Sequence, residues 1–175
     1  MDRWTTIETV SLPELLLRVG LALLFGFVIG YERDSKNKPI DFRAYMIVAV
    51  TTCVIAVLGQ ELYENVLADE YTNLDLGKII SGTLTGIGFL GAGAIMKVGG
   101  RDDQDDAQIV GTATGASVWA SGGIGLCLGF GMYLLALVGF GAIALILFIG
   151  GMFVGKVNAN GNEEHDDYRR PDNPR

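Results

Sequence analysis

The sequence predicts an all-α, polytopic membrane bundle of about five transmembrane helices. Half of its 175 residues are hydrophobic and only 19% are charged, below the roughly 25% of a typical soluble domain. The charges are also segregated, since residues 19–31, 44–60, 79–96 and 107–155 carry none. An apolar helix of about 20 residues crosses a hydrocarbon core of about 30 Å. A soluble helical bundle, the alternative, needs polar helix faces, and the last apolar stretch has none.

The first predicted span, at about 12–31, holds Glu14 and Arg18 in its opening turns. Their four-residue spacing favours an ion pair on one helix face, and snorkelling also explains an arginine near a span end. An arginine inside a membrane is equally a candidate functional residue. No small-residue cleavage site follows this apolar run, so we expect it to stay in the mature protein. The other spans are predicted at about 44–60, 77–97, 110–129 and 132–155.

The segment "GYERDSKNKPIDFRAY" (30–45) joins the first two spans. Pro39 disfavours helix, so a short connecting loop is predicted there. Glu32, Arg33 and Arg43 stand where the spans meet the loop, and we predict that they form interfacial ion pairs, with Glu32 able to pair with Arg43. Ordinary anchoring at the interface is the alternative.

The run "SGTLTGIGFLGAGAIM" (81–96) contains G-x-G-x-x-G, the pattern of dinucleotide-binding loops. That pattern needs a strand before it and a helix after it, whereas here it lies inside an apolar run of span length. In a membrane, small residues instead let helix backbones approach closely. We therefore predict that the third and fourth spans form the packed centre, with a more lipid-facing fifth span. Residues predicted for helix packing or interaction are Gly82, Gly86, Gly88, Gly91, Gly93, Gly111, Gly115, Trp119 and Ser121.

The third and fourth spans also resemble each other. "GTLTGIGFLGAGAI" (82–95) aligns with "GTATGASVWASGGI" (111–124) with six identities in fourteen positions. Consecutive spans run in opposite directions, so a true repeat would be an inverted one, the arrangement that forms sites in transporters. The alternative is that both spans use small residues independently for packing.

Charge outside the spans predicts topology and excludes some partners. Lys and Arg concentrate in the first and third loops, which places these loops and the C-terminus in the cytoplasm and the N-terminus outside. Residues 1–156 are predicted as the transmembrane domain and residues 157–175 as a disordered cytoplasmic tail. The net charge of −7 offers no concentrated basic surface, which argues against a nucleic-acid partner. Its acidic clusters favour solubility, with weak accumulation of divalent cations as the alternative. Cys53 and Cys127 support neither a disulfide nor a metal site.

Three motifs taken jointly resemble the MgtC/SapB family of integral membrane proteins: "GYERD…KP…FRAY", "TGIGFLGAGAI" and "GTATGASVWASGGIGLCLGFG". The resemblance covers about residues 13–155. The chain departs from the family pattern at Ala44 and Tyr45, where Thr followed by His or Asn is common, and at Gly82, where Gln is common. Matching positions are Gly30, Glu32, Arg33, Pro39 and Arg43 in the first hairpin, residues 86–93 in the third span, and Gly111, Thr114, Ala116, Ser117, Trp119, Ile124 and Gly125 in the fourth.

The resemblance implies a five-span, multi-pass protein of the cell membrane, linked to survival under magnesium limitation. The family is often labelled a magnesium transporter, but the resemblance better implies regulation of other membrane proteins, including the F-type ATP synthase. Many members carry a C-terminal cytoplasmic domain where this chain has a short tail. We therefore expect a non-enzymatic regulator without a cofactor, with magnesium left open as a bound ion. Its expected partners are the lipid bilayer and another membrane protein or a second copy of itself. The alternative is a transporter of magnesium or another divalent cation, against which no span holds an acidic residue at mid-membrane.

Overall fold

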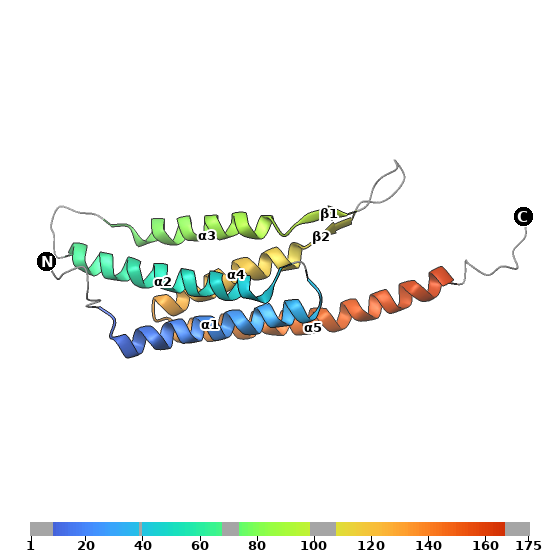
Figure 1. The fold of residues 1–175 in the computed structure, drawn as a ribbon, viewed down its shortest axis with the longest axis horizontal. Helices are drawn as coiled ribbons and strands as arrows, with labels where there is room; N and C mark the ends of the chain where they lie inside the picture. Colours follow the sequence, from blue (N-terminus) through green and yellow to red (C-terminus); the bar gives the residue numbers. More distant parts are fainter. Residues whose placement is uncertain (1–8, 39, 68–73, 99–107, 167–175) are drawn as a thin grey trace, which may run out of the picture. The chain divides into compact units, whose positions relative to one another are not determined.

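The computed structural model describes residues 9–38, 40–67, 74–98 and 108–166, which form five α-helices and one two-stranded antiparallel sheet (Figure 1). The predicted all-α fold class is confirmed. The chain divides into two compact units, Met1–Phe140 and Gly141–Arg175. The elements in order are α1 (Leu12–Ser35), α2 (Phe42–Leu67), α3 (Leu76–Ala92), β1 (Met96–Val98), β2 (Gln108–Val110), α4 (Thr112–Gly129) and α5 (Tyr133–Asp166).

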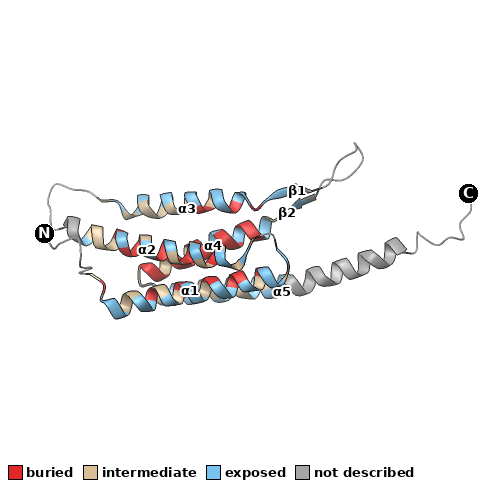
Figure 2. Cartoon of the chain, viewed as in Figure 1, coloured by how far each residue is buried: buried red, intermediate tan, exposed pale blue. Residues whose placement is uncertain are grey.

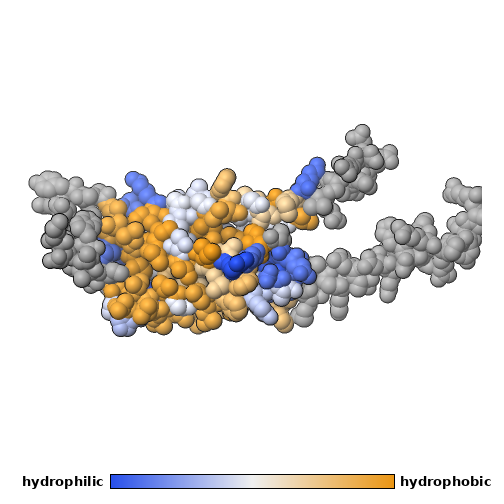
Figure 3. All heavy atoms as spheres, viewed as in Figure 1, coloured by the Kyte–Doolittle hydropathy of each residue, from blue (hydrophilic) through white to orange (hydrophobic). Residues whose placement is uncertain are grey.

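Three helical segments in the described part of the chain are long and apolar enough to cross a membrane, namely Leu12–Ser35, Phe42–Glu64 and Tyr133–Gly150. The remaining two helices are shorter, with 17 residues in α3 and 18 in α4. Their crossing of the bilayer, like the orientation of the termini, stays a prediction. On the face shown in Figure 3, hydrophobic residues cover most of the described surface and hydrophilic residues gather toward its ends.

The helix starts follow from local chemistry. Pro13 lies in the first turn of α1, where its missing N–H is no loss, and Glu14 complements the positive end of the helix dipole. Asp41 precedes α2 and accepts a 2.8 Å hydrogen bond from the backbone N–H of Arg43. Asp75 caps α3 in the same way, accepting from the N–H of Gly77 at 2.8 Å. These carboxylates satisfy amide groups that have no partner within their own helices.

Helix α4 is the centre of the first unit, where it packs against α1, α2 and α3. Figure 2 shows buried residues along α4, in contrast to the largely exposed or intermediate α3. Glycines set the close approaches: a Cβ at Gly125 would collide with the Ala49 carbonyl of α2. Similarly, a Cβ at Gly30 of α1 would lie 2.6 Å from the carbonyl oxygen of Phe42. Backbones in contact give α1, α2 and α4 their tight packing.

The prediction that the third span shares the packed centre is wrong. Only Ile87 and Gly91 of α3 are buried, and α4 packs more extensively against α2 than against α3. The physical reason is that a Cβ at Gly82 or Gly86 would have no neighbouring atom within 4 Å, so their small size is not used for packing inside the described chain. Contact between α3 and α4 is closest where Gly91 meets Gly115.

The third predicted span also ends differently. Helix α3 stops at Ala92, and residues 96–98 form a strand that pairs with residues 108–110, with Lys97 opposite Ile109. Gly111 closes this hairpin with φ +92°, a left-handed conformation that favours glycine, and a Cβ there would collide with the carbonyl oxygen of Ala94. The helix predicted at 77–97 is therefore too long, because its last residues leave the helix and enter a strand.

Helix α5 belongs to both units. It starts at Tyr133 and continues to Asp166, beyond the predicted end of the fifth span at about 155. Phe140, its last residue in the first unit, stacks on Phe25 of α1 with ring centroids 4.3 Å apart. The disorder predicted for residues 157–175 stays a prediction, and residues 167–175 lie outside the described residues.

Candidate functional site: two buried arginines at the ends of α4

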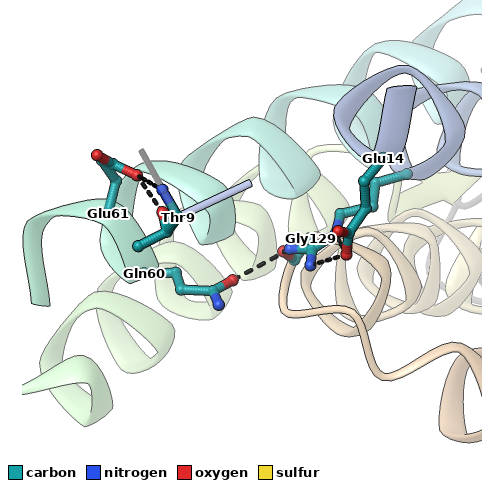
Figure 4. Close-up of polar contacts among 6 residues, drawn as sticks. Thr9, Glu14, Gln60, Glu61 and Gly129 are labelled. Carbon is teal, nitrogen blue, oxygen red and sulfur yellow. Dashed lines mark hydrogen bonds and ion pairs between the residues drawn. The ribbon is translucent and has the colours of Figure 1, made fainter. Parts of the chain in front are cut away.

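Arg18 of α1 is buried, with 5% of its surface exposed, at the end of α4. Its Nη1 donates to the carbonyl oxygen of Gly129 at 2.6 Å and to Oε1 of Gln60 at 3.1 Å, while Nε donates to Oε1 of Glu14 at 3.1 Å. Figure 4 shows Glu14, Gln60 and Gly129 converging on this contact from three helices. The predicted Glu14–Arg18 pair is therefore present, and the buried guanidinium also bonds to Gln60 of α2 and Gly129 of α4.

The turn after α4 is shaped around Arg18. Gly131 has φ +72°, and the Arg18 Nη2 lies 3.0 Å from the position that a Cβ at Gly131 would take. The N–H of Met132 donates to the carbonyl of Cys127 at 2.8 Å, the bond that closes a helix with a left-handed glycine. Because a cation stabilises the negative end of a helix dipole, Arg18 and this turn together terminate α4.

Near the same end, Glu61 of α2 holds the segment that leads into α1. The backbone N–H of Thr9 donates to Oε2 of Glu61 at 3.1 Å, and the Thr9 hydroxyl donates to the same oxygen (Figure 4). These bonds join α2 to the residues preceding α1. They add a second polar link to the one that Gln60 makes with Arg18.

Arg33, fifteen positions after Arg18 on α1, is buried at the opposite end of α4, with 6% of its surface exposed. Its Nη2 donates to the hydroxyl of Thr114 at 3.1 Å. Its Nη1 lies 4.0 Å from Oε2 of Glu32, and the other oxygen of Glu32 pairs with Lys36. The two arginines of α1 thus contact the first and the last turn of α4.

Near Arg33, some buried polar atoms have no hydrogen-bond partner. Within the described residues, Oε2 of Glu32, Nε of Arg33 and the hydroxyl of Tyr45 are buried and have no hydrogen-bond partner. Tyr45 of α2 is fully buried and interacts electrostatically with Arg33 and Glu32. Buried polar atoms are nearly always satisfied by protein, water or a ligand. Two donors beside one acceptor suit a water molecule or a small polar ligand.

Between the two arginines, the hydroxyls of the bundle interior bond to their own helices. Ser117 donates to the carbonyl of Ala113 at 2.7 Å, Ser121 to that of Ser117 at 3.0 Å, and Thr52 to that of Ala49 at 3.0 Å. Across the described residues, no group of three His, Cys, Asp or Glu side chains is placed to hold a metal ion. These three buried hydroxyls are therefore satisfied within their own helices.

The structure uses the residues predicted for packing or interaction unequally. A Cβ at Gly91 would lie 2.8 Å from the carbonyl oxygen of Gly115, so the two glycines meet backbone to backbone. Trp119 Cδ1 lies 4.0 Å from the Cβ position at Gly88, opposite a glycine of α3. Ser121 is buried on α4. The other residues predicted for packing or interaction have different positions. Gly111 lies between β2 and α4, Gly93 is the C-cap of α3, and Gly82 and Gly86 lie on the open face of α3.

Glu32 and Arg43, which could have paired with each other across the loop, each form an ion pair with a different residue. Glu32 pairs with Lys36, and Arg43 pairs with Asp41. The hydrogen bond from Arg43 lowers the pKa of the exposed Asp41 carboxyl. Each pair is local in sequence, so Glu32 and Arg43 do not fasten the loop across its width in the described structure.

Sequence reasoning missed three contributors: Gln60, Tyr45 as a buried hydroxyl, and Gly30 as a contact between α1 and α2. A buried arginine needs acceptors from other helices, which would have drawn attention to Gln60 in the second span. Gly26 and Gly30 form a G-x-x-x-G pair in the first span, a signal that the glycine-rich third and fourth spans obscured.

These features define the class: a multi-pass α-helical membrane protein with a buried arginine at each end of its central helix. The model of the MgtC family matches residues 19–154, and the chain belongs to that family. No solved structure gives a match.

Three relatives illustrate the relationship. SapB of Bacillus subtilis (strain 168) is 31% identical over 121 residues, 69% of this chain. MgtC of Salmonella typhimurium (strain LT2) is 32% identical over 127 residues, 72% of this chain. YhiD of Escherichia coli (strain K12), whose name describes a proposed magnesium transporter, is 29% identical over 134 residues, 77% of this chain. The matched regions cover 50%, 48% and 59% of these relatives, so the chain spans about half of their length.

Proposed function

We propose that this protein is a non-enzymatic regulator in magnesium homeostasis that acts by helix–helix contact with another membrane protein. The observation that carries the proposal is the open face of α3, where a Cβ at Gly82 or Gly86 would have no neighbour within 4 Å. By contrast, the space beside Gly91, Gly115 and Gly125 is filled by the backbone of adjoining helices. Small residues without an internal partner are available to a helix from outside.

The composition of that face suits an external helix. Ser81, Gly82, Thr85 and Gly86 are all exposed. The Thr85 hydroxyl bonds to the carbonyl of Ser81 at 2.8 Å, so the face presents little unsatisfied polarity to lipid. A partner helix would gain close packing there without displacing any bulky side chain.

The F-type ATP synthase is the partner that the family resemblance implies, and a second copy of the chain is the other partner of this chemistry. The magnesium link is supported by family membership and by the name of YhiD. Since the chain spans about half of its relatives' length, any role that needs their remaining part is outside this proposal.

Transport of a divalent cation is the alternative, favoured by the name of YhiD and by the unpartnered polar atoms near Arg33. Against it, the interior hydroxyls are satisfied by their own helices and the guanidinium groups at both ends of α4 repel cations. A dehydrated divalent ion needs several oxygen ligands in one place. The arrangement therefore supports the regulator more strongly.

One pair of measurements separates the two functions. Purified protein in liposomes should give no magnesium entry above empty vesicles, as followed with an internal magnesium dye. The same protein, tagged in its native membrane, should co-purify with a membrane partner. Magnesium entry that scales with protein content would establish the transporter instead.

The surface is tested with a matched pair of glycine variants. Gly86→Leu should abolish co-purification, because leucine fills the open face of α3. Gly20→Leu should not, because it adds the same side chain to open space on α1. Equal binding by both variants would show that the partner docks elsewhere.

A further inference from the structure

The β1–β2 hairpin carries apolar side chains that the rest of the described chain leaves uncovered. Ile109 of β2 is 68% exposed, and Met96 of β1 and the preceding Ile95 are also exposed. Phe89 and Leu90 in the last turn of α3, a few residues before β1, are exposed as well, with Phe89 at 81%. Met96 and Ile109 lie on opposite faces of the stem, since Met96 pairs with Val110 and Ile109 pairs with Lys97. Apolar side chains are therefore exposed on both faces of the stem, and the exposed Lys97 shares the face of Ile109.

One hydrogen bond fixes the level at which this stem lies along the bundle. The bond from Arg33 to Thr114 sets the first turn of α4 beside the last turn of α1. Val110, the last residue of β2, precedes Thr114 by four positions, and Lys36 follows Arg33 by three. The stem is therefore level with the charged α1–α2 loop, where a membrane protein meets water.

The hairpin is also held firmly to the helices. The carbonyl of Ala94 packs against Gly111 so closely that no Cβ fits, and Gly91 and Gly115 touch just inside the bundle. The stem thus has a fixed depth relative to α3 and α4.

Helix length points to the same depth. The 17 residues of α3 extend about 26 Å, short of a hydrocarbon core of about 30 Å. The apolar stem residues follow α3 toward the headgroups. The stem cannot lie deep in lipid, because the outer backbone groups of a two-stranded sheet would have no hydrogen-bond partner there. At the headgroup boundary, water satisfies these groups while apolar side chains reach the acyl chains.

We propose that the β1–β2 stem is an interfacial membrane anchor, seated at the headgroup–acyl boundary on the side of the α1–α2 loop. Ile95, Met96 and Ile109 enter the acyl region. Lys97, exposed and opposite Ile109 in the sheet, extends its ammonium group toward lipid phosphates. The occupant of this surface is the bilayer itself, continuous with the lipid that surrounds α3.

Spin-label accessibility tests the anchor in the full chain. A background with Cys53→Ala and Cys127→Ala receives a single label at Ile109→Cys, in liposomes of phosphatidylethanolamine and phosphatidylglycerol. Leu24→Cys on α1 serves as the lipid reference and Lys38→Cys in the α1–α2 loop as the water reference, since both residues are exposed. Met96→Cys provides a second label position on the other strand.

We expect the Ile109 label to collide more often with oxygen than with a water-soluble nickel complex, approaching the ratio at Leu24. A ratio equal to that at Lys38 would place the stem in water and overturn the proposal. Low collision with both reagents at Ile109 and Met96 would mean that protein covers the stem, which overturns it equally. If the Ile109 variant does not fold, the Met96 label decides by the same criteria.

Discussion

Arg18 donates a hydrogen bond of 2.6 Å from Nη1 to the carbonyl oxygen of Gly129, the last residue of α4. The last carbonyls of a helix lack partners within it, and a buried one needs a donor from elsewhere. Arg18 supplies this donor from α1 and reaches Gln60 of α2 with the same nitrogen. One guanidinium therefore connects three helices.

Arg18→Met should destabilise the protein by about 2–4 kcal/mol, because it leaves the Gly129 carbonyl and Gln60 without their charged donor. Thermal unfolding in detergent, followed by circular dichroism, measures the change. Arg43→Met is the control, because Arg43 is exposed and pairs only with the neighbouring Asp41 among the described ion pairs. Its change should stay within about 1 kcal/mol. Equal losses for both variants would contradict the structural role of Arg18.

Gly125→Ala should weaken the packing of α4 on α2, since the new methyl group meets the Ala49 carbonyl and the Thr52 hydroxyl. The expected loss is about 1–3 kcal/mol, typical of overpacking a close contact. Gly86→Ala should be neutral or stabilise the helix by up to about 1 kcal/mol, because its Cβ meets open space. Unfolding midpoints of the two variants in the same detergent decide the point. A stabilised Gly125→Ala variant would show that α2 and α4 lie farther apart.

Gly111→Ala should distort the junction between the hairpin and α4. Gly111 combines φ +92° with direct contact to the Ala94 carbonyl, so alanine has neither the space nor the backbone conformation. We expect a loss of about 1–3 kcal/mol, measured as a lower unfolding midpoint in detergent. Gly123→Ala on α4 is the control, as a Cβ there meets no atom within 4 Å. An unfolding midpoint of Gly111→Ala equal to that of Gly123→Ala would contradict the rigid junction.

Tyr45→Phe tests whether a bound molecule satisfies the buried Tyr45 hydroxyl near Arg33. If a bound water or small ligand satisfies the Tyr45 hydroxyl, removing the hydroxyl should cost about 1 kcal/mol. Tyr31→Phe, which removes an exposed hydroxyl, should leave stability unchanged. Denaturation in matched detergent solutions gives both values. A more stable Tyr45→Phe variant would mean that the hydroxyl is buried without any partner.

The helices could be predicted because charge is so sparse along the chain that apolar runs of about span length mark each of the five. The order of packing could not be predicted in the same way. Glycine content pointed to α3 and α4, whereas Gly30 and Gly125 select α2 as the neighbour of both α1 and α4 through backbone contacts that composition does not reveal.

The site was predicted in part. Glu14 and Arg18 are four positions apart on one helix, so their contact follows from helical geometry alone. Gln60 and Gly129 join that contact from distant parts of the chain, and their positions depend on how three helices pack. The strand at 96–98 was missed because "AIMKV" continues the apolar run of α3, and its partner at 108–110 follows an acidic segment of unrelated composition.

The spacing of Arg18 and Arg33 along α1 constrains the length of α4. Arg18 meets Gly129 and Arg33 meets Thr114, so fifteen steps along α1 match fifteen steps back along α4. Inserting one residue between the arginines would advance Arg33 by about 1.5 Å and turn it by about 100° away from Thr114. Restoring both contacts requires insertions of about two full turns, about seven residues, in both helices, because one added residue in each still turns Arg33 and Thr114 away from each other. The two helices can therefore change length only together and only by whole turns.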